Sequence, residues 1–174
     1  MTELTDGTVR LRPPVAADAD WIVAACSDAE NQRWLPLLPS PYGLEDAHWW
    51  LRHGDEVWRE GTAAPFVIED AEDGAPVGVI EVRTGSQPAD VGYWLAPEGR
   101  GRGLMTRALR LVAAYAFRER QVQRLELYTL LDNVRSQAVA ERAGFVREAL
   151  VPAKIESRDG GRHDAYVFVL TQPG

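Results

Sequence analysis

The stretch from residue 89 to residue 130 constrains the fold most, because its pattern is a strand, a glycine-rich turn, a helix and a second strand. In residues 104–118, apolar side chains recur on one helical face and three arginines fall away from it. That apolar stripe comprises Leu104, Ala108, Leu111, Val112 and Tyr115. A strand–helix–strand crossover joins parallel strands when both lie in one sheet. We therefore expect residues 89–96 and 124–130 to form a parallel pair.

The rest of the chain supplies further short strands and helices around this unit. The other predicted strands are residues 8–12, 65–69, 77–83, 145–149 and 164–171, and the other predicted helices are residues 17–28, 44–58 and 133–143. The turn sequence Glu72-Asp73-Gly74 makes two of these strands an antiparallel hairpin. The pattern predicts an α/β (α+β) fold with one mixed, mostly antiparallel sheet of six or seven strands and about four helices. With 174 residues, we expect a single domain over residues 1–174.

Composition excludes several classes of protein. The formal net charge of −7 argues against nucleic-acid binding, because phosphate backbones are held by surplus lysine and arginine. The single cysteine, Cys26, cannot form an intramolecular disulfide. No apolar run approaches the ~18 residues of a membrane span, and residues 1–12 lack the apolar segment of a signal peptide. We expect a cytoplasmic protein that does not enter membranes.

The turn before the long helix has the composition of an anion site. Residues 96–106 read Ala-Pro-Glu-Gly-Arg-Gly-Arg-Gly-Leu-Met-Thr, with three glycines and two arginines at a helix N-terminus. Free backbone N–H groups and the positive end of the helix dipole favour anions there, and Arg100 and Arg102 can add charge-assisted hydrogen bonds. A solvated glycine turn is the other interpretation. Thr106 replaces the third glycine of a dinucleotide fingerprint and no Gly-Lys-Ser/Thr follows, so neither a Rossmann nor a Walker loop fits.

Two segments resemble the GNAT acetyltransferases, in particular their ribosomal-protein-alanine (RimJ/RimL-like) branch. The first reads Asp-Val-Gly-Tyr-Trp-Leu-Ala-Pro-Glu-Gly-Arg-Gly-Arg-Gly-Leu over residues 90–104, and it contains the Arg-x-x-Gly of the family's acetyl-CoA signature at Arg100 and Gly103. The second, residues 133–145, is similar to the family's Asn-x-x-Ser…Gly-Phe segment. Met105 departs from the pattern, which has a small residue there.

This resemblance implies an acyl-CoA-dependent N-acetyltransferase with acetyl-CoA as co-substrate and no metal. The amine would attack the thioester directly, without a covalent enzyme intermediate. The cofactor-binding residues it implies are Trp94, Leu95, Ala96, Arg100, Gly101, Arg102, Gly103, Leu104, Met105, Thr106, Asn133 and Ser136. Ser136 would also protonate the departing thiolate, although Asn133 and Ser136 also fit an ordinary helix cap and first turn.

The general base is open between two carboxylates. Glu156 precedes a turn-like Arg-Asp-Gly-Gly and the pair His163-Asp164, as a catalytic glutamate does in similar sequences. Glu81 lies inside an otherwise apolar strand and could point into a cleft. A water chain in place of a single base is the third alternative.

The resemblance places residues 31–58 over the acceptor amine. Its wall would then include Trp34, Leu35, Trp49 and Trp50, although tryptophans are also common core residues. The acidic composition favours a cationic acceptor, either a peptide N-terminus, a polyamine or an aminoglycoside. A non-catalytic acyl-CoA-binding regulator is the alternative function, and similar proteins suggest a homodimer.

Overall fold

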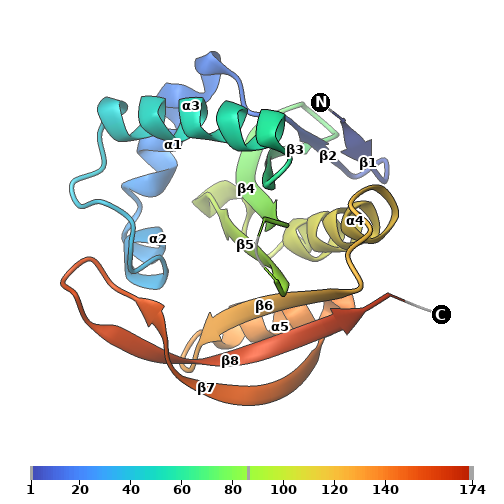
Figure 1. Cartoon of the computed structure of the whole chain (residues 1–174). Helices are drawn as coiled ribbons and strands as arrows, with labels where there is room; N and C mark the ends of the chain where they lie inside the picture. The colour runs from blue at the N-terminus through green and yellow to red at the C-terminus, as the bar shows by residue number, and fades with distance from the viewer. Residues whose placement is uncertain (1, 86, 173–174) are drawn as a thin grey trace.

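The computed structural model describes residues 2–85 and 87–172 (Figure 1). Within this part of the chain, eight strands form one sheet in the order β1-β2-β3-β4-β5-β6-β8-β7, with five α-helices around it. The strands are β1 (Leu4–Thr5), β2 (Val9–Arg12), β3 (Ala63–Asp70), β4 (Pro76–Arg83), β5 (Ala89–Leu95), β6 (Arg124–Leu130), β7 (Val146–Glu156) and β8 (Arg162–Thr171). The helices are α1 (Ala19–Cys26), α2 (Ala29–Trp34), α3 (Leu44–Glu60), α4 (Leu104–Glu119) and α5 (Val134–Ala143), with short 3-10 turns η1 (Ala16–Asp18) and η2 (Pro97–Gly99). The predicted mixed α/β architecture is confirmed.

The sheet is antiparallel except at its centre. Strands β3 and β4 form the predicted hairpin, and β5 pairs in parallel with β6 through α4. The parallel ladder is short: it joins Ala89 to Leu125, Asp90 to Glu126, and Val91 to Leu127. The predicted strand–helix–strand unit is therefore present, with its two strands in one sheet.

Helix α4 forms because its sequence supplies one continuous apolar face. Four members of the predicted stripe are at most 3% exposed, namely Leu104, Ala108, Val112 and Tyr115. They pack into the larger core cluster, where the Phe66 ring meets the Tyr115 ring edge-on at 5.7 Å. A smaller cluster lies between α1 and α3 and reaches Trp94 on β5. Every helix in the described residues is too short or too polar to cross a membrane.

The structure has more elements than predicted, and each addition has a local cause. Strand β1 is only two residues long, which is too short for an alternating pattern. Helix α2 begins directly after its N-cap Asp28, whose carboxylate accepts the N–H groups of Glu30 and Asn31, both at 3.1 Å. Strand β7 runs to Glu156 instead of ending at residue 149, and its mostly exposed side chains give no apolar periodicity.

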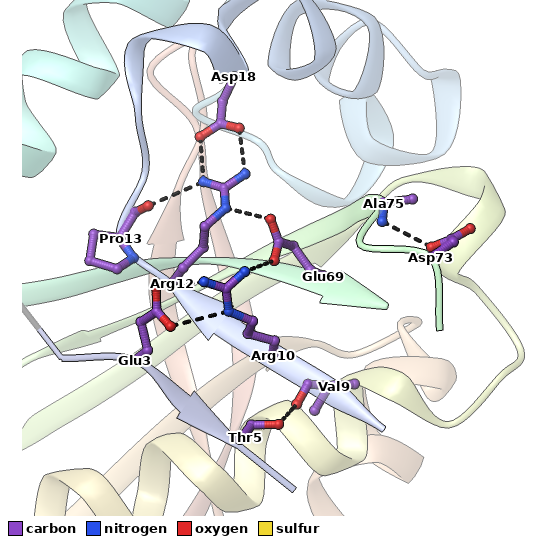
Figure 2. A network of polar contacts seen from close by, with 10 residues as sticks. All are labelled: Glu3, Thr5, Val9, Arg10, Arg12, Pro13, Asp18, Glu69, Asp73 and Ala75. Carbon is purple, nitrogen blue, oxygen red and sulfur yellow. Dashed lines mark hydrogen bonds and ion pairs between the residues drawn. The ribbon is translucent and has the colours of Figure 1, made fainter. Parts of the chain in front are cut away.

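An ion-pair network ties the first strands to the start of α1 (Figure 2). The Arg12 guanidinium donates to both carboxylate oxygens of Asp18, at 2.7 and 2.8 Å, and through Nε to Glu69 at 2.5 Å. All three side chains are at least four-fifths buried, with 16%, 6% and 9% exposed. Arg10 reaches the other Glu69 oxygen at 3.1 Å but is 46% exposed and also pairs with Glu3. Arg12 is thus the buried cation that neutralises two buried carboxylates.

We expect Arg12→Ala to lower the free energy of unfolding by about 3–5 kcal/mol, because it leaves Asp18 and Glu69 buried without their counter-charge. The matched control is Arg10→Ala, for which about 0–1 kcal/mol is expected, because that side chain is half-exposed. Urea unfolding of both variants measures the difference. Equal losses would contradict the assignment of Arg12 as the central cation.

Candidate active site

A gap between the two parallel strands is the central feature of the site. Pairing of β5 with β6 stops at Val91 and Leu127, so residues 92–95 and 128–130 continue without each other as partners. A cavity of about 1020 Å³ opens there, lined by both strands, α2, the turn before α4, the start of α5 and the end of β7. Backbone N–H and C=O groups beyond the end of a strand pairing need other hydrogen-bond partners. An extended chain with amide groups fits this requirement.

The turn before α4 has the backbone of an anion site. Gly101 and Gly103 have φ angles of 74° and 77°, in the left-handed region that favours glycine. A Cβ at either position would meet nothing within 4 Å, so conformation and not space requires glycine there. The first N–H groups of a helix have no partner inside it. The hydroxyl of Thr106, in the same first turn, is buried and lacks a partner among the described residues.

The two arginines of this turn point at carboxylates of the chain itself. Arg100 donates to Asp28 at 2.5 Å, to Glu30 at 3.1 Å and to the Leu95 carbonyl at 3.1 Å, and it holds the pKa of Asp28 below its usual range. Arg102 pairs with Asp70 on β3. Both guanidiniums thus already have acidic partners in this structure, and their role toward a diphosphate stays a prediction. The backbone N–H groups are the donors that stay available.

The predicted cofactor-binding residues divide into those that line the cavity and those that do not. Trp94, Leu95, Arg100, Gly101, Met105, Asn133 and Ser136 line the cavity. Ala96, Arg102, Gly103, Leu104 and Thr106 lie outside the lining, and the Ala96 N–H donates to the Val77 carbonyl at 2.9 Å. The departure at Met105 has a structural reason, since its side chain is 3% exposed and packs in the core cluster.

A hydroxyl pair lies at the start of α5. Asn133 caps this helix, its Oδ1 accepting the Ser136 N–H at 3.1 Å. The Ser136 Oγ is 2.9 Å from the Tyr93 hydroxyl, which also donates to the Ser136 carbonyl at 3.2 Å. Burial raises the pKa of Tyr93 to about 12, so this phenol stays protonated at neutral pH. The two side chains form a short chain of O–H groups beside the gap.

The two candidate bases occupy different positions. Glu156, at the end of β7, lines the cavity and accepts a hydrogen bond from Arg162 at 2.5 Å. Glu81 does not line it and instead accepts from Arg83 at 3.1 Å. Arg83 in turn pairs with Asp90, and both of these residues do line the cavity.

Only part of the predicted acceptor wall reaches the cavity. Trp34 and Leu35 line it from α2 and the residue after it. Trp49 is 59% exposed and stacks on His53, with ring centroids 5.0 Å apart. Trp50 packs with the small core cluster of α1 and α3. Helix α3 therefore places its tryptophans away from the cavity, and the wall on this side comes from α2.

Several cavity residues had not been singled out from the sequence. Thr129 is 2% exposed, lines the cavity and has a hydroxyl without a partner among the described residues. Asn31 donates to the Leu95 carbonyl at 3.1 Å and so joins α2 to β5. Tyr93 lies inside the segment 90–104 that resembles the family motif, but its contact with Ser136 becomes visible only in the folded structure. No local sequence signal marks these positions, because their roles depend on long-range packing. Within the described residues, no cluster of three or more metal-ligating side chains is present.

The fold is thus a mixed α/β fold in which two parallel strands part beside a glycine-rich helix start. Residues 8–146 match the family model described as acetyltransferase (GNAT) domain, so the chain belongs to this family, as the motifs predicted. The chain is 35% identical over 103 residues to the Bacillus subtilis protein YdaF, whose name places it among ribosomal N-acetyltransferases. That match covers 55% of this chain and 53% of YdaF, so it spans about half of that relative.

Two further relatives cover more of the chain. The [Ribosomal protein uS5]-alanine N-acetyltransferase of Escherichia coli is 28% identical over 155 residues, which is 83% of this chain and 79% of that protein. The solved structure of Mycobacterium smegmatis RimJ in complex with CoA-disulfide superimposes with a TM-score of 0.84 at 26% identity, covering 98% of this chain and 86% of that one. The three-dimensional likeness thus extends over nearly the whole described chain.

Proposed function

We propose that this protein is a single-domain N-acetyltransferase that moves an acetyl group from acetyl-CoA to a primary amine. The gap between β5 and β6 carries this proposal, because it offers unpaired strand edges between an anion-binding turn and a pair of hydroxyls. The pantetheine amides would bond backbone groups of residues 92–94 and 128–129 on the edges that face the gap. The diphosphate would face the N–H groups of the glycine turn.

The chemistry needs a neutral amine, a polarised carbonyl and a proton for the departing sulfur. A free strand N–H of residues 92–95 is suited to polarise the carbonyl. Ser136 is the proposed donor to the sulfur, and Tyr93 can replace that proton by turning its O–H from the Ser136 carbonyl to the Ser136 Oγ, 2.9 Å away. Glu156 is the proposed base, since of the two candidates it is the one that lines the cavity.

For the acceptor, we propose the N-terminus of a basic protein or peptide. The net charge of −7 favours a cationic substrate, and relatives such as the uS5 enzyme are named for ribosomal proteins. Such a role would belong in the cytoplasm. The homodimer suggested by similar proteins stays a prediction, to be measured by light scattering.

The first experiment is calorimetric titration with acetyl-CoA, followed by a thiol-release assay with peptides, polyamines and aminoglycosides. We expect binding, and turnover that is fastest with basic peptides bearing a free N-terminus. An N-terminally blocked copy of the best peptide is the control. Faster turnover of a polyamine or aminoglycoside would overturn the acceptor class. Binding without any turnover would make the protein an acyl-CoA-binding regulator, and no binding would refute the cofactor.

If Ser136 and Tyr93 act as one donor unit, Ser136→Ala should lower kcat roughly 100-fold and Tyr93→Phe about 10-fold. The affinity for acetyl-CoA should stay nearly constant in both. The double variant should then be little slower than Ser136→Ala alone, because members of one unit do not add. Tyr166→Phe, at a tyrosine outside the cavity lining, is the control. If the losses in kcat of the two single variants add in the double variant, Ser136 and Tyr93 act independently and the proposed donor unit is wrong.

Glu156→Gln should lower kcat/KM at neutral pH and recover part of the loss as pH rises. The reason is that a larger fraction of the acceptor amine is then already neutral and needs no base. The pH profile of Glu81→Gln, measured beside it, decides between the two carboxylates. An unaltered profile for Glu156→Gln together with a changed one for Glu81→Gln would reverse the assignment.

A further inference from the structure

The only lysine of the chain faces the proposed acetyl-transfer cavity. Lys154, on β7, is among the lining residues and is exposed to solvent. Its Nζ lies 4.1 Å from the centroid of the Tyr128 ring. An ammonium over an aromatic face is held there by the ring's quadrupole. The lysine amine is therefore held at a defined place in the cavity.

That place is where the two parallel strands part. Tyr128 follows Leu127, the last residue of β6 that pairs with β5, and it also lines the cavity. The gap between β5 and β6 thus begins at Tyr128, the residue whose ring contacts the Lys154 amine. The hydroxyl pair on α5 and the Glu156 carboxylate border the same cavity. A primary amine, a proton acceptor and a proton donor are thereby gathered around the gap.

A backbone irregularity in β7 directs this side chain. The register of β7 against β8 shifts between Val151 and Ile155, and Ala153 has a φ of 50°, in the left-handed region. The Ala153 N–H donates to Asp164 at 2.8 Å, and its carbonyl accepts from Arg162 Nε at 2.7 Å. Successive residues of a regular strand point to opposite faces, yet residues 154, 155 and 156 all line the cavity. Two side chains thus hold a strained conformation that brings Lys154 to the cavity.

We propose that Lys154 is a site of self-acetylation, a modification that uses the cavity's acetyl-CoA when no other amine is present. This inference rests on the proposed function. The Lys154 ammonium first loses a proton to water. The electron pair of Nζ then forms a bond to the acetyl carbonyl carbon while the carbon–sulfur bond breaks. The nitrogen gives up its second proton as the amide forms, and the sulfur keeps the electron pair of the broken bond and takes up one proton, so the products are acetylated Lys154 and free CoA.

Acetylation would also change the cavity itself. The amide carries no charge, so the cation–π contact with Tyr128 is lost, and the added acetyl group occupies space near the start of the gap. A chain acetylated at Lys154 should therefore transfer acetyl groups to other amines at an altered rate. The reaction is intramolecular, so a basic peptide that enters the cavity should slow it by competition.

The test incubates the purified full chain with acetyl-CoA alone and follows its intact mass and peptide map. We expect one acetyl group at Lys154, added at least ~10-fold faster than in the same chain unfolded in urea, because the folded cavity positions both reactants. The rate constant should not depend on protein concentration. Equal rates in the folded and unfolded chain, a rate that rises with protein concentration, or label only on the α-amino group would overturn the proposal.

Two variants locate the label and test its cause. Lys154→Arg keeps a cation over Tyr128 but has no nucleophilic amine, so the internal label should disappear. Tyr128→Leu keeps the lysine and removes the ring, so labelling should slow roughly three- to fivefold. Circular dichroism checks that both variants are folded. Internal label that persists in Lys154→Arg, or an unchanged rate in Tyr128→Leu, would contradict the assignment.

Thiol release with peptides, measured on the same preparation, separates this proposal from the proposed function. Peptide turnover without a Lys154 label refutes self-acetylation alone. A Lys154 label without turnover of any added amine supports self-acetylation and overturns the proposed acceptor. Bound acetyl-CoA with neither product refutes both.

Discussion

The early end of the β5–β6 ladder is the constraint on which the site depends. Seven strand pairings join the eight described strands, and only this one is parallel. Stopping it after three residue pairs separates the facing edges of the two strands in the middle of a sheet, so their backbone groups lose the partners that a longer ladder would supply. Buried groups of this kind are costly unless a ligand or water bonds them. The sheet stays continuous through the three residue pairs that β5 and β6 do form, and the larger core cluster includes side chains of both strands and of α4.

The sequence predicted the parts of this arrangement that depend on local pattern. The stripe of α4 repeats at helical spacing, and Gly103 comes directly before it, so both the helix and its glycine turn could be placed. Strand β6 was predicted with its observed bounds, Arg124–Leu130. Local pattern fails where an element is short or its partners are distant. Helix α2 depends on one capping carboxylate, and the register shift of β7 depends on hydrogen bonds between Ala153 and the side chains of Asp164 and Arg162 on the neighbouring strand β8.

Side-chain directions were the least predictable part of the site. Three tryptophans of residues 31–58 looked equivalent as acceptor contacts, but only Trp34 reaches the cavity. The difference comes from helix faces, because Trp50 turns toward α1 while Trp49 turns to solvent. Likewise, the arginines of the glycine turn suggested charge for a diphosphate, and the structure pairs them with carboxylates far away in sequence. The spacing of residues along the sequence does not reveal which distant carboxylate pairs with each arginine.

These ion pairs reconcile an acidic protein with a site for an anionic ligand. Arg100, Arg102 and Arg107 are each paired with aspartate or glutamate, so the turn presents backbone N–H groups and a helix dipole with little net side-chain charge. An anion in the proposed site would meet fixed backbone dipoles, because the guanidiniums already have acidic partners. Its binding would then depend on shape, since only a group that enters the turn could meet several N–H groups together.

The pairing at Glu30 has a consequence for the acceptor side. One oxygen of this carboxylate accepts from Arg100 in the glycine turn at 3.1 Å, and the other accepts from Arg135 on α5 at 2.7 Å. Helix α2, which carries Glu30 and the cavity residue Trp34, is thereby tied to both sides of the cavity. Any ligand that draws either guanidinium away from Glu30 releases one of these ties. Helix α2 therefore takes its position in part from ion pairs to both sides of the cavity, one to the glycine turn and one to α5.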